Sequence, residues 1–308
     1  MATTEAFYTA VQPSPLGQRF CLWHADAAQA PRALVVHVHA FAEEMNKSRR
    51  MVALQSRALA AAGFAVWRMD LLGCGDSAGE FSDASWAAWV DDVLASVALA
   101  RERHAATWPG AAPPELWLWG QRAGALLAAE AAQALAEPVN LLFWQPSLQG
   151  KQVLQQFLRL ETAGALLGKN QEASSTQADA KGGARAALAR GEVAAVAGYG
   201  LAPALTTGLE AARLAAPARQ ARLEWLDLAP AANQEPTPAA QRHIEAWTAA
   251  GWQVRHRSVA GPSFWQTTEI EEAPDLLEAT THALLTSPMA VPSCLGQAAQ
   301  AALRQVAA

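Results

Sequence analysis

The sequence predicts an α/β protein with a doubly wound, mostly parallel sheet, and three observations support this prediction. Apolar runs of five or six residues alternate three times with helical patterns in the first half of the chain. Each helical pattern separates two such runs, as right-handed crossovers between parallel strands require. Hydrophobic residues make up 52% of the 308 residues, which is enough for one large core.

The first half of the chain gives the clearest element pattern. The run 33–38 (ALVVHV) predicts a strand that is buried on both faces. A polar loop is expected from 39 to 48, followed by a helix over 49–62 with Ser48 as its N-cap. The elements expected next are a strand at 64–69, a glycine-rich loop at 70–81, a helix at 86–103, a strand at 115–119, a helix at 123–135 and a strand at 139–144.

The alternation stops near residue 147 and resumes near 219. We therefore expect residues 1–146 and 219–308 to form the core, and 147–218 to form a helical cap over the carboxyl ends of the strands. Within this insertion we expect helices at 151–167 and 203–214, a mobile polar loop at 168–183 and a short apolar piece at 193–199. After it we expect strands at 222–228 and 252–259, helices at 241–250 and 274–285, and a tail from Ser287 that packs as a last helix or frays.

Composition excludes several functional classes. The net charge is −5 with no long basic run, which argues against nucleic acid as a partner. The three cysteines are far apart and lack C-x-x-C spacing, so we expect a reducing compartment and no metal site. The first ten residues do not resemble a signal peptide, and no uncharged apolar span reaches 18 residues. We expect a cytoplasmic protein without a cofactor; a homodimer stays open.

Twelve tryptophans against two tyrosines are unusual. Core filling accounts for them most simply, whereas a ligand cleft lined by some of them, or an exposed protein-binding patch, are the alternatives.

The most informative motif is the run 120–124 (GQRAG), between an apolar strand and an alanine-rich helix. Strand, tight turn with two glycines and helix form the setting of the nucleophile elbow, G-x-S-x-G, in α/β-hydrolases. The nucleophile position holds Arg122, which cannot lose its proton and cannot attack a carbonyl. Arg122 is expected either to pair with an acid such as Glu43 or Glu44, or to bind an anionic ligand group.

The charged segment 39–50 follows the first core strand, where α/β-hydrolases place their oxyanion loop. It is either a solvated loop or, as we prefer, part of a polar site shared with Arg122. In that site His39 or Glu43 would act as a base on water while Arg122 stabilises the oxyanion. We expect His37 and His39 to differ in facing, so at most one of them points to this site. The ligand-binding residues expected beside them are Glu44, Asn46, Lys47 and Gln121.

The loop 70–79 (DLLGCGDSAG) does not fit the spacing of a dinucleotide-binding motif. Its glycines permit turns, and we expect Asp70 and Ser77 to form hydrogen bonds within the loop. Cys74 is expected to be a small buried thiol; it would be a nucleophile only with a base beside it.

A catalytic base is missing from its usual place. The loop after the last strand, 260–265 (AGPSFW), holds no histidine. His256 lies within a strand, His282 lies within a helix, and Asp227 ends its strand. The open functions are a non-hydrolytic ligand-binding protein, a hydrolase or transferase of esters, thioesters or amides with an unconventional site, and a protein–protein scaffold.

Four runs carry a family resemblance over about residues 20–285: FAEEMNKSRRM (41–51), DLLGCGDSAG (70–79), WLWGQRAGALLA (117–128) and AGYGL (197–201). They resemble the exosortase A system-associated hydrolases of type 2, in the α/β-hydrolase superfamily, in which an arginine at the elbow looks typical. The resemblance implies a role beside exopolysaccharide biosynthesis and protein sorting in Gram-negative bacteria, with a saccharide or other small-molecule ligand and a protein partner in that machinery. Arg122, Pro262 and Ser263 depart from the wider superfamily pattern, so we do not expect hydrolysis by the usual triad. A pseudoenzyme is the preferred hypothesis, and an unconventional enzyme stays open.

Overall fold

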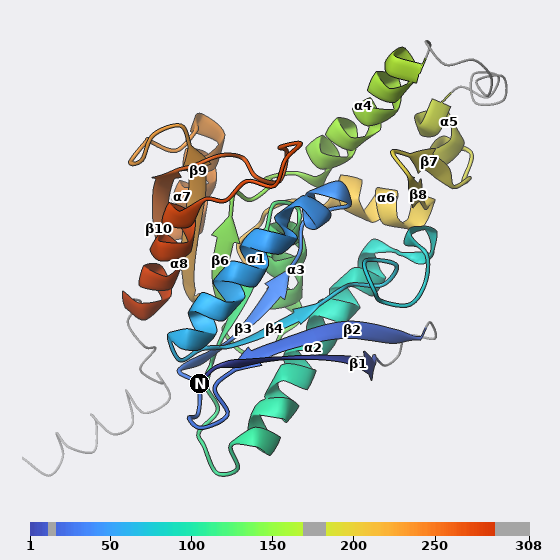
Figure 1. Ribbon diagram of the computed structural model, residues 1–308. Helices are drawn as coiled ribbons and strands as arrows, with labels where there is room; N and C mark the ends of the chain where they lie inside the picture. Colours follow the sequence, from blue (N-terminus) through green and yellow to red (C-terminus); the bar gives the residue numbers. More distant parts are fainter. Residues whose placement is uncertain (12–16, 169–182, 287–308) are drawn as a thin grey trace, which may run out of the picture.

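In the computed structural model, which describes residues 1–11, 17–168 and 183–286, an eight-stranded sheet forms the centre of the molecule (Figure 1). The loop expected at 168–183 and the tail from Ser287 fall almost entirely outside these residues. The strand order is β1-β2-β4-β3-β5-β6-β9-β10, and every neighbouring pair from β4 to β10 is parallel. The predicted fold class is therefore confirmed. The strands are β1 (Thr3–Ala10), β2 (Gln18–Ala25), β3 (Ala33–Val38), β4 (Ala65–Met69), β5 (Glu115–Gln121), β6 (Asn140–Trp144), β9 (Arg222–Ala229) and β10 (Gln253–Ala260).

The antiparallel edge formed by β1 and β2 was not predicted. β1 pairs with β2 along its full length, and β2 pairs antiparallel with β4. Most β1 side chains are exposed, so this strand lacks the apolar run that identifies a buried strand in a sequence.

Helices cover both faces of the sheet. α1 (Glu43–Ala61) and α8 (Pro274–Thr286) bury one set of side chains, which includes Met51, Leu59 and Leu276. α2 (Trp86–Thr107), α3 (Gly124–Ala134) and α7 (Pro238–Ala249) cover the opposite face. A short 3-10 helix, η1 (Phe81–Asp83), ends the glycine-rich loop before α2.

The chain between β6 and β9 adds a group of elements at one end of the sheet, which we call the cap segment (Figure 1). It contains α4 (Gly150–Gly168), α5 (Gly183–Ala189), the hairpin of β7 (Ala194–Val196) and β8 (Tyr199–Leu201), and α6 (Pro203–Ala211). The hairpin turn consists of Ala197 and Gly198, both with positive φ, as a two-residue turn between strands favours.

All twelve tryptophans are buried, each at most 8% exposed. The expectation of core filling is confirmed, and the tryptophan-rich surface that a scaffold function would use does not exist. No helix among the described residues is long and apolar enough to span a membrane.

Candidate functional site

The turn between β5 and α3 has the geometry of a nucleophile elbow. Arg122 adopts φ +54°, a left-handed conformation that non-glycine residues rarely accept. Gly124 is required by close packing, because a Cβ atom there would lie 2.3 Å from the carbonyl oxygen of Val38 and 2.5 Å from that of His39. Gly120 likewise packs against the backbone of Ala125. The two glycines therefore let β5, α3 and β3 approach closely, and the residue at the corner is Arg122.

Each of the three guanidinium nitrogens of Arg122 contacts a protein group. Its Nη2 lies 3.1 Å from Oε1 of Glu44, and its Nε donates to both oxygens of the same carboxylate at 3.2 and 3.3 Å. Nη1 donates to the carbonyl oxygen of Gln145 at 3.3 Å. The guanidinium carbon also lies 5.2 Å from the ring centroid of Trp265, within the range of a cation–π contact. The expectation that Arg122 pairs with a neighbouring acid is confirmed, with Glu44 as the partner.

Trp265 belongs to the loop after the last strand, where a hydrolase of this fold carries its catalytic histidine. The contact between Arg122 and Trp265 therefore occupies the place where a serine and a histidine would meet. Sequence reasoning examined this loop for a histidine and missed the role of its tryptophan.

The expected polar loop 39–48 is wrong in extent, because α1 begins at Glu43 rather than at 49. Two acidic residues in its first turn, Glu43 and Glu44, suit the positive end of the helix dipole. Ser48 is consequently not an N-cap. It lies within α1, donates to the carbonyl oxygen of Glu44 at 2.6 Å and accepts a hydrogen bond from Gln121 at 2.7 Å.

His39 is held as a buried neutral imidazole. Its Nδ1 donates to the carbonyl oxygen of Ala40 at 2.8 Å, which leaves Nε2 to accept from the backbone N–H of Leu71 at 3.3 Å. Burial lowers the pKa of this imidazole. Both nitrogens are thus used by the backbone, so the geometry gives no support to the predicted role of His39 as a base. His37 packs on Trp119 and His39 packs on Trp89, yet both border the same small cavity. Alternation along the strand does not explain their different packing, because residues i and i+2 of a strand share a face and His39 lies beyond the end of β3.

A cleft of about 340 Å³ lies between the start of α1, α4 of the cap segment and the loop after β10. Three of the predicted site residues, Glu43, Glu44 and Lys47, line it together. The remaining lining residues are Phe41, Val153, Gln156, Phe157, Leu160, Trp265 and Gln266. Glu44 and Trp265, the two side chains that hold Arg122, form part of this wall. The cleft combines a charged side from the core with an apolar side from the cap segment, as ligand pockets usually do.

Two other predicted site residues are not in the cleft wall. Asn46 is exposed and donates to the hydroxyl of Tyr199 at 2.9 Å. Gln121 is buried, and its Oε1 has no hydrogen-bond partner among the described residues. It borders a small cavity of about 20 Å³, together with His39, His37 and Arg68; the last two also carry buried nitrogens without a described partner. This volume is enough for about one water molecule.

Tyr199 connects the cap segment to α1, and sequence reasoning did not assign it a role. Its hydroxyl donates to Oε2 of Glu43 at 3.2 Å while accepting from Asn46, one helical turn along α1. Its ring packs on Phe157 and Phe81 with centroids 5.8 and 5.0 Å away. Burial and the neighbouring Glu43 carboxylate raise the pKa of Tyr199 to about 12, so the hydroxyl keeps its proton.

The loop 70–79 is structural, as expected. Ser77 donates to the carbonyl oxygen of Asp70, whose carboxylate accepts from the N–H of Asp76 at 3.1 Å. Cys74 is buried, and burial raises the pKa of its thiol far above the ordinary range, so it is not an activated nucleophile.

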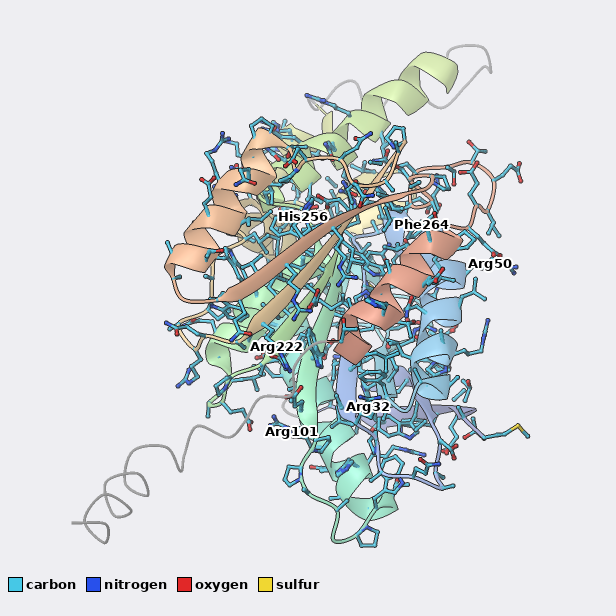
Figure 2. All side chains as sticks on the ribbon, turned by 90° about the vertical axis from the view of Figure 1, so that its left-hand side faces the viewer. Arg32, Arg50, Arg101, Arg222, His256 and Phe264 are labelled. Carbon is cyan, nitrogen blue, oxygen red and sulfur yellow. The ribbon has the colours of Figure 1, made fainter. Side chains whose placement is uncertain are left out.

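An acid–base pair exists elsewhere, on the last two strands. His256, on the edge strand β10 that faces the viewer in Figure 2, contacts Asp227 of β9 with Nε2 2.9 Å from Oδ2. Ser258 is the register partner of Asp227, but its buried Oγ has no hydrogen-bond partner among the described residues. The ring of His256 packs on Trp225, which belongs to the core beneath α2, α3 and α7. Trp265 belongs to the core on the other face, so this pair is not part of the elbow site.

The described residues contain no cluster of three or more histidine, cysteine or acidic side chains that could hold a metal ion.

Comparison with known proteins agrees with the geometry. A search of curated protein sequences found no significant match. The family model for serine aminopeptidase, S33, matches residues 29–192.

Three solved structures share the fold at low identity. Est1E from Butyrivibrio proteoclasticus with bound ferulic acid has a TM-score of 0.60 and 16% identity, covering 91% of this chain and 98% of that chain. A putative hydrolase from Agrobacterium vitis has a TM-score of 0.54 and 17% identity, covering 92% and 98%. XC6422 from Xanthomonas campestris, a serine hydrolase without a lid, has a TM-score of 0.51 and 17% identity, covering 94% and 97%.

These structures show the fold, and the family model covers more than half of the chain, including β3, the elbow and the whole of α4. The chain therefore belongs to the serine aminopeptidase S33 family of the α/β-hydrolase superfamily.

Proposed function

We propose that this protein is a non-hydrolytic member of its family that binds a small ligand in the cleft between α1, α4 and the loop after β10. One observation carries the proposal: the corner that holds a serine in this fold holds Arg122, and Glu44, Gln145 and Trp265 keep its guanidinium in place. The Arg122 side chain cannot act as a nucleophile, and the loop after the last strand contains no histidine that could act as a base.

The four sequence runs that resemble the exosortase A system-associated hydrolases of type 2 support a setting for this ligand. On that resemblance, the ligand belongs to exopolysaccharide or protein-sorting systems, and a protein partner would come from the same machinery. An anionic ligand bound to Nε and Nη2 of Arg122 would require displacement of Glu44, which accepts from both nitrogens. A ligand in the cleft requires no such displacement.

Turnover measurements test the absence of hydrolysis. We expect no saturable hydrolysis of p-nitrophenyl esters, aryl thioesters or aminoacyl anilides, because losing a triad member typically costs about 10⁴-fold in rate. Arg122→Ser is expected to stay inactive, since it restores a hydroxyl without a base. Saturable turnover by the wild type that disappears in Glu43→Gln would contradict the proposal. It would favour the second candidate, an unconventional hydrolase with Glu43 as base, because Glu43 lines the cleft.

A further inference from the structure

The cleft has two chemically different sides, and together they define a ligand class. Val153, Phe157 and Leu160 follow one another at helical spacing on α4 and form the apolar side. Leu160 is 45% exposed, which is unusual for a leucine at the wall of a cleft. An apolar group placed against this stripe would be removed from water together with Leu160, and this burial is favourable.

The opposite side carries two carboxylates and one ammonium group. Glu43, Glu44 and Lys47 line the cleft, whereas Arg122 does not. Glu44 is paired with Arg122, whereas Lys47 keeps its positive charge and donates to the carbonyl oxygen of Gln266 at 3.5 Å. Among the described residues no cation lies within 4.0 Å of Glu43, whose carboxylate accepts one hydrogen bond, from Tyr199.

The Glu43 carboxylate is also held in a defined position. The Tyr199 hydroxyl donates to one of its oxygens, and Asn46 fixes that hydroxyl from the other side. A raised pKa keeps the Tyr199 proton in place as a donor. The remaining lone pairs of Glu43 can accept hydrogen bonds from a ligand, and a carboxylate binds a cationic donor more strongly than a neutral one.

We propose that the cleft binds amphiphilic cations, with an ammonium-type head group on Glu43 and an apolar body against Val153, Phe157 and Leu160. This inference rests on the proposed function, because it assigns a ligand class to the same cleft. It makes Glu43 the residue that selects the head group, and Tyr199 the residue that positions Glu43.

Three probes with one tail and different heads test the inference: n-octylammonium chloride, 1-octanol and sodium octanoate, titrated into the full chain by calorimetry at pH 7.5. We expect octylammonium to bind most tightly. Glu43→Gln keeps the shape and removes the charge, and should weaken octylammonium about three- to tenfold, because its head group would lose a charge-assisted hydrogen bond at a solvated site. Octanol binding should change less than about twofold. Glu210→Gln, on the exposed side of α6 outside the cleft, is the matched control and should change neither.

A second variant separates this inference from the proposed function. Gln156 is exposed and lines the cleft, so Gln156→Trp should fill part of it without disturbing the core, and circular dichroism checks the fold. The inference fails if octanoate binds most tightly, or if Glu43→Gln leaves the preference for octylammonium intact. In either case, loss of octanol binding in Gln156→Trp would still support the cleft as the binding site. If no probe binds, or if Gln156→Trp changes none of the three affinities, the proposed function fails as well.

Discussion

At the scale of single residues, the arginine at the elbow is held by neighbouring side chains of complementary chemistry. A guanidinium at a strained corner beside a helix N-terminus would be unfavourable alone, because the helix dipole is positive there. Glu44 supplies a carboxylate with bidentate geometry, and Trp265 supplies an aromatic face. The three side chains should therefore behave as one energetic unit.

A double-mutant cycle measures this unit. Arg122 and Glu44 have side-chain exposures of only 14% and 24%, so their coupling should exceed that of a surface pair. We expect the cycle of Arg122→Met and Glu44→Gln to give a coupling free energy of about 1–2 kcal/mol in urea unfolding. Additive effects of the two substitutions, within about 0.3 kcal/mol, would show that the ion pair contributes no stability.

At the scale of elements, the elbow depends on the contact of α3 with β3. A methyl group at residue 124 would lie 2.3 Å from the carbonyl oxygen of Val38, which belongs to a central strand and cannot move freely. We expect Gly124→Ala to lower the free energy of unfolding by more than about 2 kcal/mol. Gly110→Ala is a suitable comparison, because its Cβ would meet no atom within 4 Å and its cost is conformational only, about 1 kcal/mol. Equal losses in the two variants would refute the packing argument.

The hairpin of β7 and β8 is attached to α1 largely through one hydroxyl. Tyr199→Phe removes its hydrogen bonds with Glu43 and Asn46 and retains the ring contacts with Phe81 and Phe157. We expect a loss of about 0.5–1.5 kcal/mol and faster amide hydrogen exchange in residues 194–201. Tyr8→Phe, on an exposed position of β1, provides the same chemical change without these partners and should leave exchange in the hairpin unchanged.

At the scale of the whole molecule, buried histidines should make stability depend on pH. Burial lowers the pKa of His24 to about 4 and lowers those of His37 and His39 as well. Between about pH 4 and 6.5 the unfolded chain therefore binds more protons than the folded one, so stability falls as the pH is lowered through this window. In chemical unfolding at pH 7.5, 6.5 and 5.5, we expect little change between pH 7.5 and 6.5 and a loss of roughly 1 kcal/mol from His24 between pH 6.5 and 5.5, with His37 and His39 acting in the same direction. A flat profile across this range would contradict the buried neutral state.

The sequence predicts the fold well where local and tertiary preferences agree. The strands buried on both faces, β3, β5 and β6, were located to within two residues, because a continuous apolar run has one structural solution. The start of α1 was missed, because Glu43, Glu44 and Asn46 form a polar run that predicts a loop when the helix dipole and tertiary partners are ignored. The elbow with its arginine was visible from spacing alone.

The site was predicted only in part, since its partners lie far apart in the chain. Arg122 and Glu44 are separated by 78 residues, and Tyr199 reaches Glu43 from 156 residues away. Trp265 joins from the end of β10, and nothing local marks it as a contact of Arg122. The spacing and types of the residues predicted a charged region around Arg122 and the segment 39–50. The cleft itself is formed by the packing of the cap segment on α1, a contact that the sequence did not predict.

The burial of all twelve indoles has a practical outcome for experiments. Each indole is shielded from solvent in the native state, so intrinsic emission should lie toward the blue and shift strongly to the red when the chain unfolds. Trp265 alone among them borders the cleft, and a bound probe would perturb its local environment. Intrinsic tryptophan fluorescence should therefore distinguish unfolding of the whole chain from ligand binding in the cleft, without any added dye.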